Sequence, residues 1–351
     1  MPTDTSRTSA GRLPNEPANK SAHLVARSHL VRRLILKPEA GGVISALLVF
    51  LAFAILAGRS GFLTSLGTAY WLDTASELGI VAIPVGMLMI AGEFDLSVGA
   101  VVGACSMIVA MCTGYYSLTP WVGVSLAFVV AALIGFANGL IVVSTRLPSF
   151  IVTLSTMLMV TGGILGLSIA LTGSSSISAV PAGAAAVVFA FKWHEFHISI
   201  FYWIATAAVG SYAMQRTAFG NWVYATGGSQ QTARLAGVPT DLVKIILFVC
   251  SSLGGALVST IETFTFQNGN VTLGSAYVFS GIAACVIGGV LLTGGYGSLV
   301  GTMFGALTYG IVSMGVFFLG WNADLTELFI GLLLLLAVLA NNRLRLLAMT
   351  R

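Results

Sequence analysis

The sequence GGSQQTARLAGVP at residues 227–239 is a short polar stretch between two long apolar segments. Ser229 is a favourable N-cap residue, residues 230–236 have the length of two helical turns, and Gly237 suits the left-handed position that ends a helix. Pro239 then stops the helix from continuing. The stretch therefore predicts a capped polar helix outside the lipid, where a soluble partner protein could hold it.

The composition is that of a protein surrounded by lipid over most of its length. Of 351 residues, 57% are hydrophobic and only 8% are charged, and the mean hydropathy is +0.95. Soluble domains carry about 25% charged residues. The formal charge of +4 is small and dispersed, so it does not indicate a nucleic-acid partner.

The hydropathy pattern beyond residue 40 predicts an all-α, polytopic integral membrane protein with about ten transmembrane helices. Each predicted span is close to the roughly 20 residues that cross a bilayer. Their limits are 41–58, 75–92, 96–114, 120–143, 148–172, 199–215, 242–266, 277–293, 298–319 and 324–341. The apolar patch at residues 180–191 would fit a further re-entrant or surface element.

The predicted spans divide the chain into three parts. Residues 1–40 form a polar, basic tail without the apolar core of a signal peptide. Part of it, residues 24–36, has the pattern of an interfacial amphipathic helix, and a disordered tail is the alternative for the residues before it. The transmembrane domain is expected over residues 41–342, with the polar helix in a loop at 216–241. Residues 343–351 form a short basic tail.

Lysine and arginine are concentrated on one side of the predicted spans. With the N-terminus in the cytoplasm, only Arg59 and Lys192 of the 16 lysines and arginines lie on the outer side. The positive-inside rule therefore predicts a cytoplasmic N-terminus. It also predicts that the polar helix after Ser229 is cytoplasmic.

The segment GEFDLSVG at residues 92–99 interrupts an apolar run with two carboxylates. An acidic residue near the bilayer centre costs about 2.5–3.5 kcal/mol. One interpretation is a broken helix in which Asp95 and Ser97 line a transport path. The other is a turn at the inner membrane surface, where Asp95 or Ser97 caps the following span.

Three further polar residues are candidates for a transport path. Glu262 is compatible with the protein interior and with the outer interface. Asn138 could bind a hydroxylated substrate or hydrogen-bond a neighbouring helix. Asn268 lies among further amides and two phenylalanines near the predicted outer surface, a combination suited to a sugar.

Glycine spacing predicts close helix packing. Glycines four residues apart occur at 99 and 103, at 135 and 139, and in the series 297, 301 and 305, and this spacing lets helix backbones approach closely in lipid. The similarity of residues 98–104 to residues 300–306 would fit two related halves, each starting a span that runs outward.

Sequence motifs of catalysis are absent. The chain contains no Gly-Lys dipeptide, so it has no Walker A loop, and any ATP must be bound by another subunit. The four cysteines lie in apolar spans without a CxxC pair, and HEFH at residues 194–197 lacks the histidine spacing of a zinc protease. We therefore expect no enzymatic activity, no metal site and no bound cofactor.

Several segments resemble the membrane-spanning permease subunit of bacterial ABC importers of the ribose and simple-sugar type. The resemblance runs from about residue 71 to residue 342. It is carried by residues 92–99, 146–154, 216–220, 224–228, 233–238, 282–289 and 294–298. The chain departs from the family at Gln230, Gln231 and Thr232, where such loops usually place an acidic residue and alanines. It also departs at Val278 and Ser280, which are often acidic in relatives.

The resemblance implies an ATP-driven, binding-protein-dependent importer of a monosaccharide or related polyol in the bacterial inner membrane. A separate ABC ATPase subunit would hold the cytoplasmic coupling helix. A second permease subunit, identical or homologous, would complete the path, and a periplasmic or extracellular solute-binding protein would deliver the solute. The coupling residues implied are Gly227, Gly228, Ser229, Gln230, Gln231, Ala233, Arg234, Leu235 and Gly237.

The alternative from another class is an ion-coupled secondary transporter of a small polar solute. In that interpretation Asp95 and Glu262 would bind protons or sodium ions, and no soluble partner would be needed. It leaves the capped cytoplasmic helix without a role.

Overall fold

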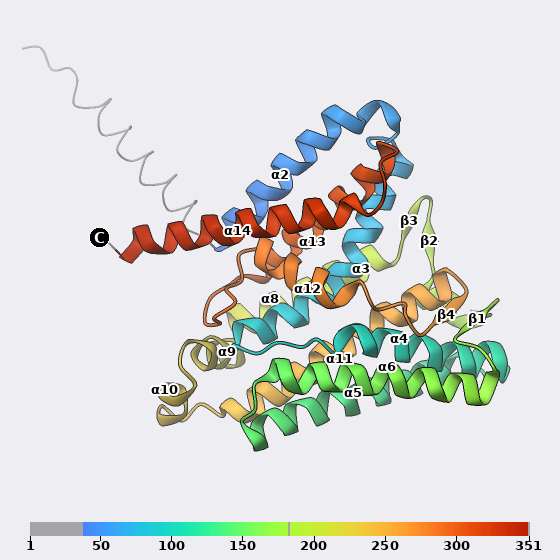
Figure 1. Ribbon diagram of the computed structural model, residues 1–351, viewed down its shortest axis with the longest axis horizontal. Coiled ribbons are helices and arrows are strands. Elements are labelled where there is room, and N and C mark those ends of the chain that lie inside the picture. The colour runs from blue at the N-terminus through green and yellow to red at the C-terminus, as the bar shows by residue number, and fades with distance from the viewer. Residues whose placement is uncertain (1–37, 182, 350–351) are drawn as a thin grey trace, which may run out of the picture. The chain divides into compact units, whose positions relative to one another are not determined.

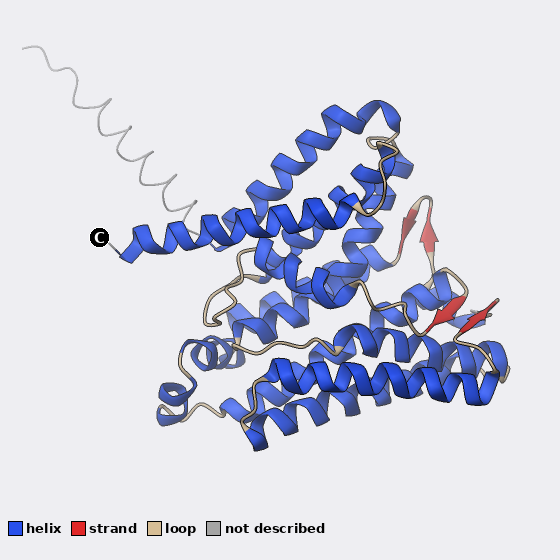
Figure 2. Ribbon diagram, in the orientation of Figure 1, coloured by secondary structure: helices blue, strands red, loops and turns tan. Residues whose placement is uncertain are grey.

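The computed structural model describes residues 38–181 and 183–349 of the chain. The predicted amphipathic segment, residues 24–36, lies outside the described residues, as does almost all of the N-terminal tail predicted at 1–40. The C-terminal tail predicted at 343–351 instead continues the last helix as far as Met349. The described part is a bundle of helices with two short strand pairs (Figures 1 and 2).

The helices form two groups separated by an irregular connection. The first group is α2 (Pro38–Ala57), η1 (Gly58–Ser60), α3 (Ser65–Ile90), α4 (Val98–Ala110), the π-helical turn η2 (Met111–Tyr115), α5 (Pro120–Thr145) and α6 (Ser149–Thr172). The connection contains β1 (Ser176–Ser178), η3 (Gly183–Ala185), α7 (Ala186–Phe189), β2 (Lys192–Trp193) and β3 (Phe196–His197). The second group is α8 (Ser199–Arg216), α9 (Ala218–Gly228), α10 (Gln230–Leu235), α11 (Thr240–Thr265), β4 (Asn268–Asn270), α12 (Tyr277–Ile287), α13 (Leu299–Phe318) and α14 (Leu325–Met349).

The polytopic, all-helical fold class is confirmed, and the predicted spans each contain a helix. Within the described residues, seven helices are long and apolar enough to cross a bilayer, so a count of ten spans is not established. The prediction of a span at 277–293 was wrong in length, because α12 ends at Ile287 and an irregular loop follows. The apolar patch at 180–191 forms the short helices η3 and α7.

Helix α3 begins ten residues before its predicted start. The side chain of Thr64 accepts a hydrogen bond from the backbone N–H of Gly67 at 3.0 Å, which caps the helix at Ser65. The polar residues Asp73 and Thr74 lower the hydropathy of this first part. Asp73 is buried, because it is bonded to residues far along the chain rather than to solvent.

The two helix groups pack as related halves. Helix α3 lies against α12 and α13 in the same way that α11 lies against α4 and α5, and α4 contacts α5 and α6 as α12 contacts α13 and α14. Helices α3 to α6 therefore correspond to α11 to α14. The similarity of residues 98–104 to 300–306 relates α4 to α13, which do not correspond in this scheme, so it does not mark the repeat.

The predicted glycine faces make close contacts inside the chain. A Cβ atom on Gly305 would lie 1.9 Å from the carbonyl oxygen of Ala284, so only glycine lets α13 approach α12 there. A Cβ on Gly135 would lie 2.6 Å from the backbone of α11. Gly103 differs from the prediction, because it faces the loop carbonyl of Val271, 2.0 Å from its would-be Cβ, rather than a helix.

Two sets of connections lie at opposite ends of the bundle (Figure 1). At one, which we call the α10 end, lie α9, α10 and the connection between α5 and α6. At the other, the strand end, β1 pairs antiparallel with β4, and β2 pairs with β3. There, Asp73 on α3 holds the β2–β3 hairpin through a 2.6 Å contact between its Oδ2 and the Nδ1 of His197.

Candidate coupling site and buried polar networks

The predicted capped helix is present as α10. The hydroxyl of Ser229 accepts a hydrogen bond from the backbone N–H of Thr232 at 3.3 Å, as expected of an N-cap. Gly237 has a φ of +84°, and its N–H donates to the carbonyl oxygen of Arg234 at 3.0 Å. The loop at 216–241 differs from the prediction in holding a second helix, α9, whose last residues are the glycines before Ser229.

Helix α10 has one buried side and a large exposed remainder. Ala233 packs against the protein and is 4% exposed, whereas Leu235 is 84% exposed. An isolated helix of this length is not stable in water. Its cap and its contacts with the rest of the chain therefore maintain it, and Leu235 projects from a fixed position.

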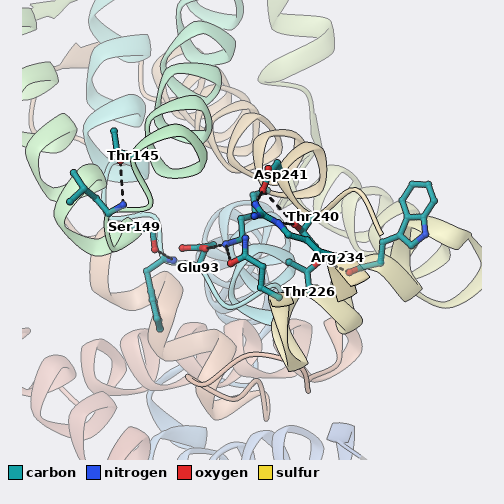
Figure 3. A network of polar contacts seen from close by, with 12 residues as sticks. Glu93, Thr145, Ser149, Thr226, Arg234, Thr240 and Asp241 are labelled. Carbon is teal, nitrogen blue, oxygen red and sulfur yellow. Dashed lines mark hydrogen bonds and ion pairs between the residues drawn. The ribbon is translucent and has the colours of Figure 1, made fainter. Parts of the chain in front are cut away.

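Arg234 fastens α10 to the start of α11. Its Nε donates to the hydroxyl of Thr240 at 2.8 Å, and its guanidinium forms an ion pair with Asp241 (Figure 3). Thr240 and Asp241 are the first residues of α11. The sequence indicated Arg234 as a contact for a partner subunit, and the structure shows its guanidinium turned toward its own chain.

A buried ion pair lies next to α10. Lys244 on α11 pairs with Glu93, which follows α3, and these residues are 7% and 9% exposed. The Nζ atom of Lys244 also donates to Oε1 of Gln230 at 2.8 Å. Three separate elements therefore meet at one ammonium group.

A cleft of about 630 Å³ opens between α10 and the connection from α5 to α6. Glu93 and Lys244 line it together with Gln230, and Arg146 and Leu235 line its other parts. The cleft connects the surface of the α10 end to the ion pair. It belongs to the same site as α10.

Close backbone packing joins three segments beside this site. A Cβ atom on Gly227 would lie 1.8 Å from the carbonyl oxygen of Ile90, so a side chain there would displace the end of α3 or of α9. The N–H of Gly295 donates to the same Ile90 oxygen at 2.8 Å. Gly228, the next residue along, has no atom within 4 Å of its would-be Cβ. Two adjacent glycines that the sequence grouped together thus have different roles.

Tyr224 on α9 makes a further bond to the loop between α12 and α13. Its hydroxyl donates to the carbonyl oxygen of Gly297 at 3.0 Å. Burial raises the pKa of this hydroxyl, and the negative charge of Glu39 raises it further. The phenol therefore remains a donor over the physiological pH range.

The segment between α3 and α4 is unwound, and α6 satisfies its backbone. The N–H of Phe94 donates to the hydroxyl of Ser149 at 3.0 Å (Figure 3), and the N–H of Leu96 donates to the hydroxyl of Thr153 at 3.2 Å. Irregular backbone at membrane depth requires such internal partners. Residues 91–97 therefore form an irregular segment whose backbone is bonded inside the chain, and Asp95 accepts from the Ser97 N–H at the start of α4, as the turn interpretation expects.

Asp95, Ser97 and Asn138 are brought together in one buried network. Both Asp95 oxygens accept hydrogen bonds: Oδ1 from the N–H and hydroxyl of Ser97, at 2.9 and 2.6 Å, and Oδ2 from the hydroxyl of Ser251 at 2.7 Å. The amide of Asn138 donates to the Ser97 oxygen at 2.9 Å and accepts from the hydroxyl of Thr156 at 2.6 Å. The network ties α4 to α5, α6 and α11. The Ser97 side chain makes no capping bond to α4.

Glu262 and Asn268 lie apart from this network, toward the strand end. Glu262 on α11 is 5% exposed and accepts a hydrogen bond from the hydroxyl of Tyr277 on α12. Glu77, in the middle of α3, lies within electrostatic range of Glu262. Asn268 begins β4, and its Oδ1 accepts from the hydroxyl of Ser176 at 3.0 Å.

The family model described as "Branched-chain amino acid transport system / permease component" matches residues 67–338. The chain belongs to this permease family.

Named relatives of the permease cover most of its length. The fructose import permease protein of Rhizobium meliloti is 31% identical over 320 residues, which are 88% of this chain and 86% of the relative. The ribose import permease protein of Escherichia coli strain K12 is 29% identical over 278 residues, 78% of this chain and 84% of the relative. The galactose/methyl galactoside import permease protein of the same strain is 29% identical over 316 residues, 85% and 92% of the two chains. No solved structure matches the chain.

Sequence reasoning missed two acidic partnerships of the permease. Glu77 was overlooked because the span was expected to begin at residue 75, which put Glu77 at a helix end instead of mid-helix. The pair of Glu93 with Lys244 joins residues far apart in sequence, and no local pattern indicates it. Lys244 lies four positions after Thr240 in α11, so its place near the start of a span is the only signal the sequence offers.

Proposed function

We propose that this permease forms part of the membrane path of an ATP-driven importer of a monosaccharide or related polyol. A separate ATPase subunit supplies the energy, and a periplasmic or extracellular binding protein supplies the solute. The observation that carries the proposal is α10, a capped helix that is exposed on one side and bonded on the other to α11. Relatives named for fructose, ribose and galactose import support the substrate class.

The α10 end is cytoplasmic in this proposal, and the membrane is the bacterial inner membrane. Arg146, Arg216, Arg234 and Lys244 belong to this end, whereas Lys192 belongs to the β2–β3 hairpin at the strand end. This distribution supports a cytoplasmic α10 and a cytoplasmic N-terminus.

The ATPase contact is made by the exposed side of α10. Leu235 is 84% exposed on a helix whose remaining exposed side chains are polar, so a groove on the partner would bury it. Burial of a leucine side chain contributes about 1.5–3 kcal/mol. Ser229 and Gly237 hold the helix in shape, and Arg234 sets its angle to α11.

A second permease subunit, identical or homologous, packs on α6. Gly162, Gly163 and Gly166 on this helix have no atom within 4 Å of their would-be Cβ atoms, whereas the glycines of α5 and α13 are already in contact. Leu158 and Met159, one turn earlier, are each 65% exposed. Small residues with adjacent apolar side chains form contact faces between helices in lipid.

The solute path passes the site of Glu262. Its carboxylate, the phenol of Tyr277 and the carboxylate of Glu77 can hydrogen-bond the hydroxyl groups of a sugar. Asn268 lies at the strand end, where the solute would enter. Asp95 and its partners have their hydrogen bonds filled within the chain, and we assign them to holding the unwound segment beside the path.

Uptake by proteoliposomes tests the proposal. The permease is reconstituted with its ATPase and binding protein, and uptake of labelled ribose, fructose and galactose is measured with and without internal ATP. At least one sugar is expected to accumulate only when ATP and the ATPase are both present. Accumulation driven by a proton or sodium gradient without the ATPase would contradict the proposal.

A matched pair of variants tests the contact itself. Leu235→Glu should weaken ATPase binding to the detergent-solubilised permease by about tenfold or more, because the side chain can no longer be buried in an apolar groove. Leu118→Glu changes another exposed leucine, in the connection to α5 at the strand end, and should leave ATPase binding unchanged. Equal binding by both variants would remove Leu235 from the interface.

A further inference from the structure

The buried pair of Glu93 and Lys244 is unusual among the charges of this permease. The described residues contain four ion pairs, and this pair has the lowest side-chain exposure, 11% for Glu93 and 8% for Lys244. Removing two charges from water is costly, and an apolar pair of similar volume often serves stability as well. Stability alone therefore does not account for it.

Lys244 is bonded to two elements besides its own helix. An ammonium group has three donors, so it can hold the Glu93 carboxylate and the Gln230 amide oxygen together. Gln230 is the first residue of α10. A movement of α10 away from α11 must either break the hydrogen bond between Gln230 and Lys244 or displace the Lys244 ammonium group.

Glu93 lies at the start of the unwound segment. Its own N–H donates to the carbonyl oxygen of Leu88 at 3.1 Å, which closes the end of α3. The following residues reach Ser149 on α6 and then Asp95, whose bonds hold the start of α4. Displacement of the Glu93 carboxylate is therefore passed directly to the segment that links α3 and α4.

We propose that the chain Gln230–Lys244–Glu93 transmits movement of α10 to the unwound segment, with Lys244 as the positioning residue. This proposal rests on the proposed function, because α10 moves only if an ATPase drives it. The other ion pair of this region, Arg234 with Asp241, is 38% and 46% exposed and connects α10 only to α11. Among the side-chain contacts of α10 in the described residues, the Lys244 contact is the one that leads to the α3–α4 segment.

The neutral side chain at position 230 has a specific consequence. A glutamate there would compete with Glu93 for the same ammonium group, whereas the Gln230 amide leaves the full charge interaction to Glu93. The arrangement thus combines a strong contact inside the bundle with a weaker one to α10. When a shift of α10 moves the Lys244 ammonium group, the Glu93 carboxylate therefore stays paired with it and moves as well.

The test is the ratio of solute uptake to ATP hydrolysis in the fully reconstituted importer. Lys244→Met and Glu93→Gln should each lower this ratio by about tenfold, while ATPase binding stays within about twofold of the wild type. The double variant Glu93→Lys/Lys244→Glu should restore the ratio to within about threefold of the wild type, because the pair is re-formed with reversed charges. Glu195→Gln removes the exposed pair with Lys192 at the strand end and should leave the ratio unchanged.

Gln230→Ala provides an independent arm, because it leaves the ion pair intact. It should lower the ratio by about threefold with an unchanged unfolding temperature. If the Lys244 and Glu93 variants do not insert into the membrane, the Gln230→Ala measurement alone tests the proposal. The proposal would be overturned if Gln230→Ala had the wild-type ratio of uptake to ATP hydrolysis. It would also be overturned if the Lys244 and Glu93 single variants lost uptake and hydrolysis in parallel and the charge-reversed double variant did not restore them. Failure of the proposed function is a different result: the wild-type importer itself would show no ATP-driven uptake.

Discussion

Asp95 and Glu262 are both carboxylates buried in an apolar bundle, and their surroundings are opposite in kind. Asp95 accepts three hydrogen bonds from two serines, is fully buried, and belongs to a network that ties four helices together. Glu262 accepts one hydrogen bond, from the hydroxyl of Tyr277, and a second carboxyl group, that of Glu77, lies within electrostatic range. Three hydrogen bonds fill most of the acceptor capacity of Asp95, whereas a single side-chain hydrogen bond, from Tyr277, reaches Glu262 within the described residues.

We propose that the difference separates a structural role, for Asp95, from a transport role, for Glu262. Buried polar groups that are fully bonded stabilise one arrangement of the chain, whereas groups with unused bonding capacity favour a ligand that completes it. The sequence places both acids in the same class of intramembrane carboxylates, and their partners distinguish them. Four measurements test the distinction, beginning with the variant that should have the largest effect on stability.

Asp95→Ala should cost about 3 kcal/mol of stability, because the Ser97 N–H and the hydroxyls of Ser97 and Ser251 lose their acceptor inside the protein. Denaturant unfolding of the purified permease measures this. Asp95→Asn keeps an acceptor oxygen and should lose less than half as much. An Asp95→Ala protein of wild-type stability but altered solute affinity would reverse the assignment.

Gly227→Ala tests how tightly the ends of α3 and α9 pack against each other. Its Cβ would lie 1.8 Å from the Ile90 carbonyl oxygen, so the variant should lose about 1–3 kcal/mol. Gly228→Ala is the matched control, because its Cβ meets no atom within 4 Å. The same unfolding measurement should separate the two variants. Equal losses would mean that the junction is looser than the contacts indicate.

Thr156→Val removes one donor at the edge of the Asp95 network while keeping the shape of the side chain. The Asn138 oxygen loses a 2.6 Å hydrogen bond, which should cost about 1 kcal/mol. Thermal unfolding in detergent measures this loss. Ser155→Ala on the same helix removes an exposed hydroxyl and serves as the control. No difference between the two variants would count against a cooperative network.

Glu262→Gln should have the smallest effect on stability, within about 0.5 kcal/mol, because the amide oxygen still accepts from Tyr277 and the size and shape of the side chain are kept. ATP-driven uptake should nevertheless fall several-fold. Unfolding and uptake are measured on the same preparation. If the variant lost much of its stability while the folded fraction took up solute normally, Glu262 would have a structural role like that of Asp95.

Local rules predicted the local features of this fold. Ser229 and Gly237 cap α10 as their residue types indicate, and the apolar runs mark the helices. The start of α3 was missed because Asp73 is buried by a contact with His197, far along the chain, so polarity there does not mean exposure. The partnership of Lys244 with Glu93 was missed for the same reason. Hydropathy shows which segments enter the lipid, but not which polar groups meet inside it.

The most direct test of the account is the accessibility of position 235. A Leu235→Cys variant is made in a chain whose four native cysteines are replaced, and it is treated with a membrane-impermeant thiol reagent. We expect labelling in inside-out vesicles only, and protection of that thiol when the ATPase subunit is bound. Labelling from the outer side, or equal labelling with and without the ATPase, would contradict it.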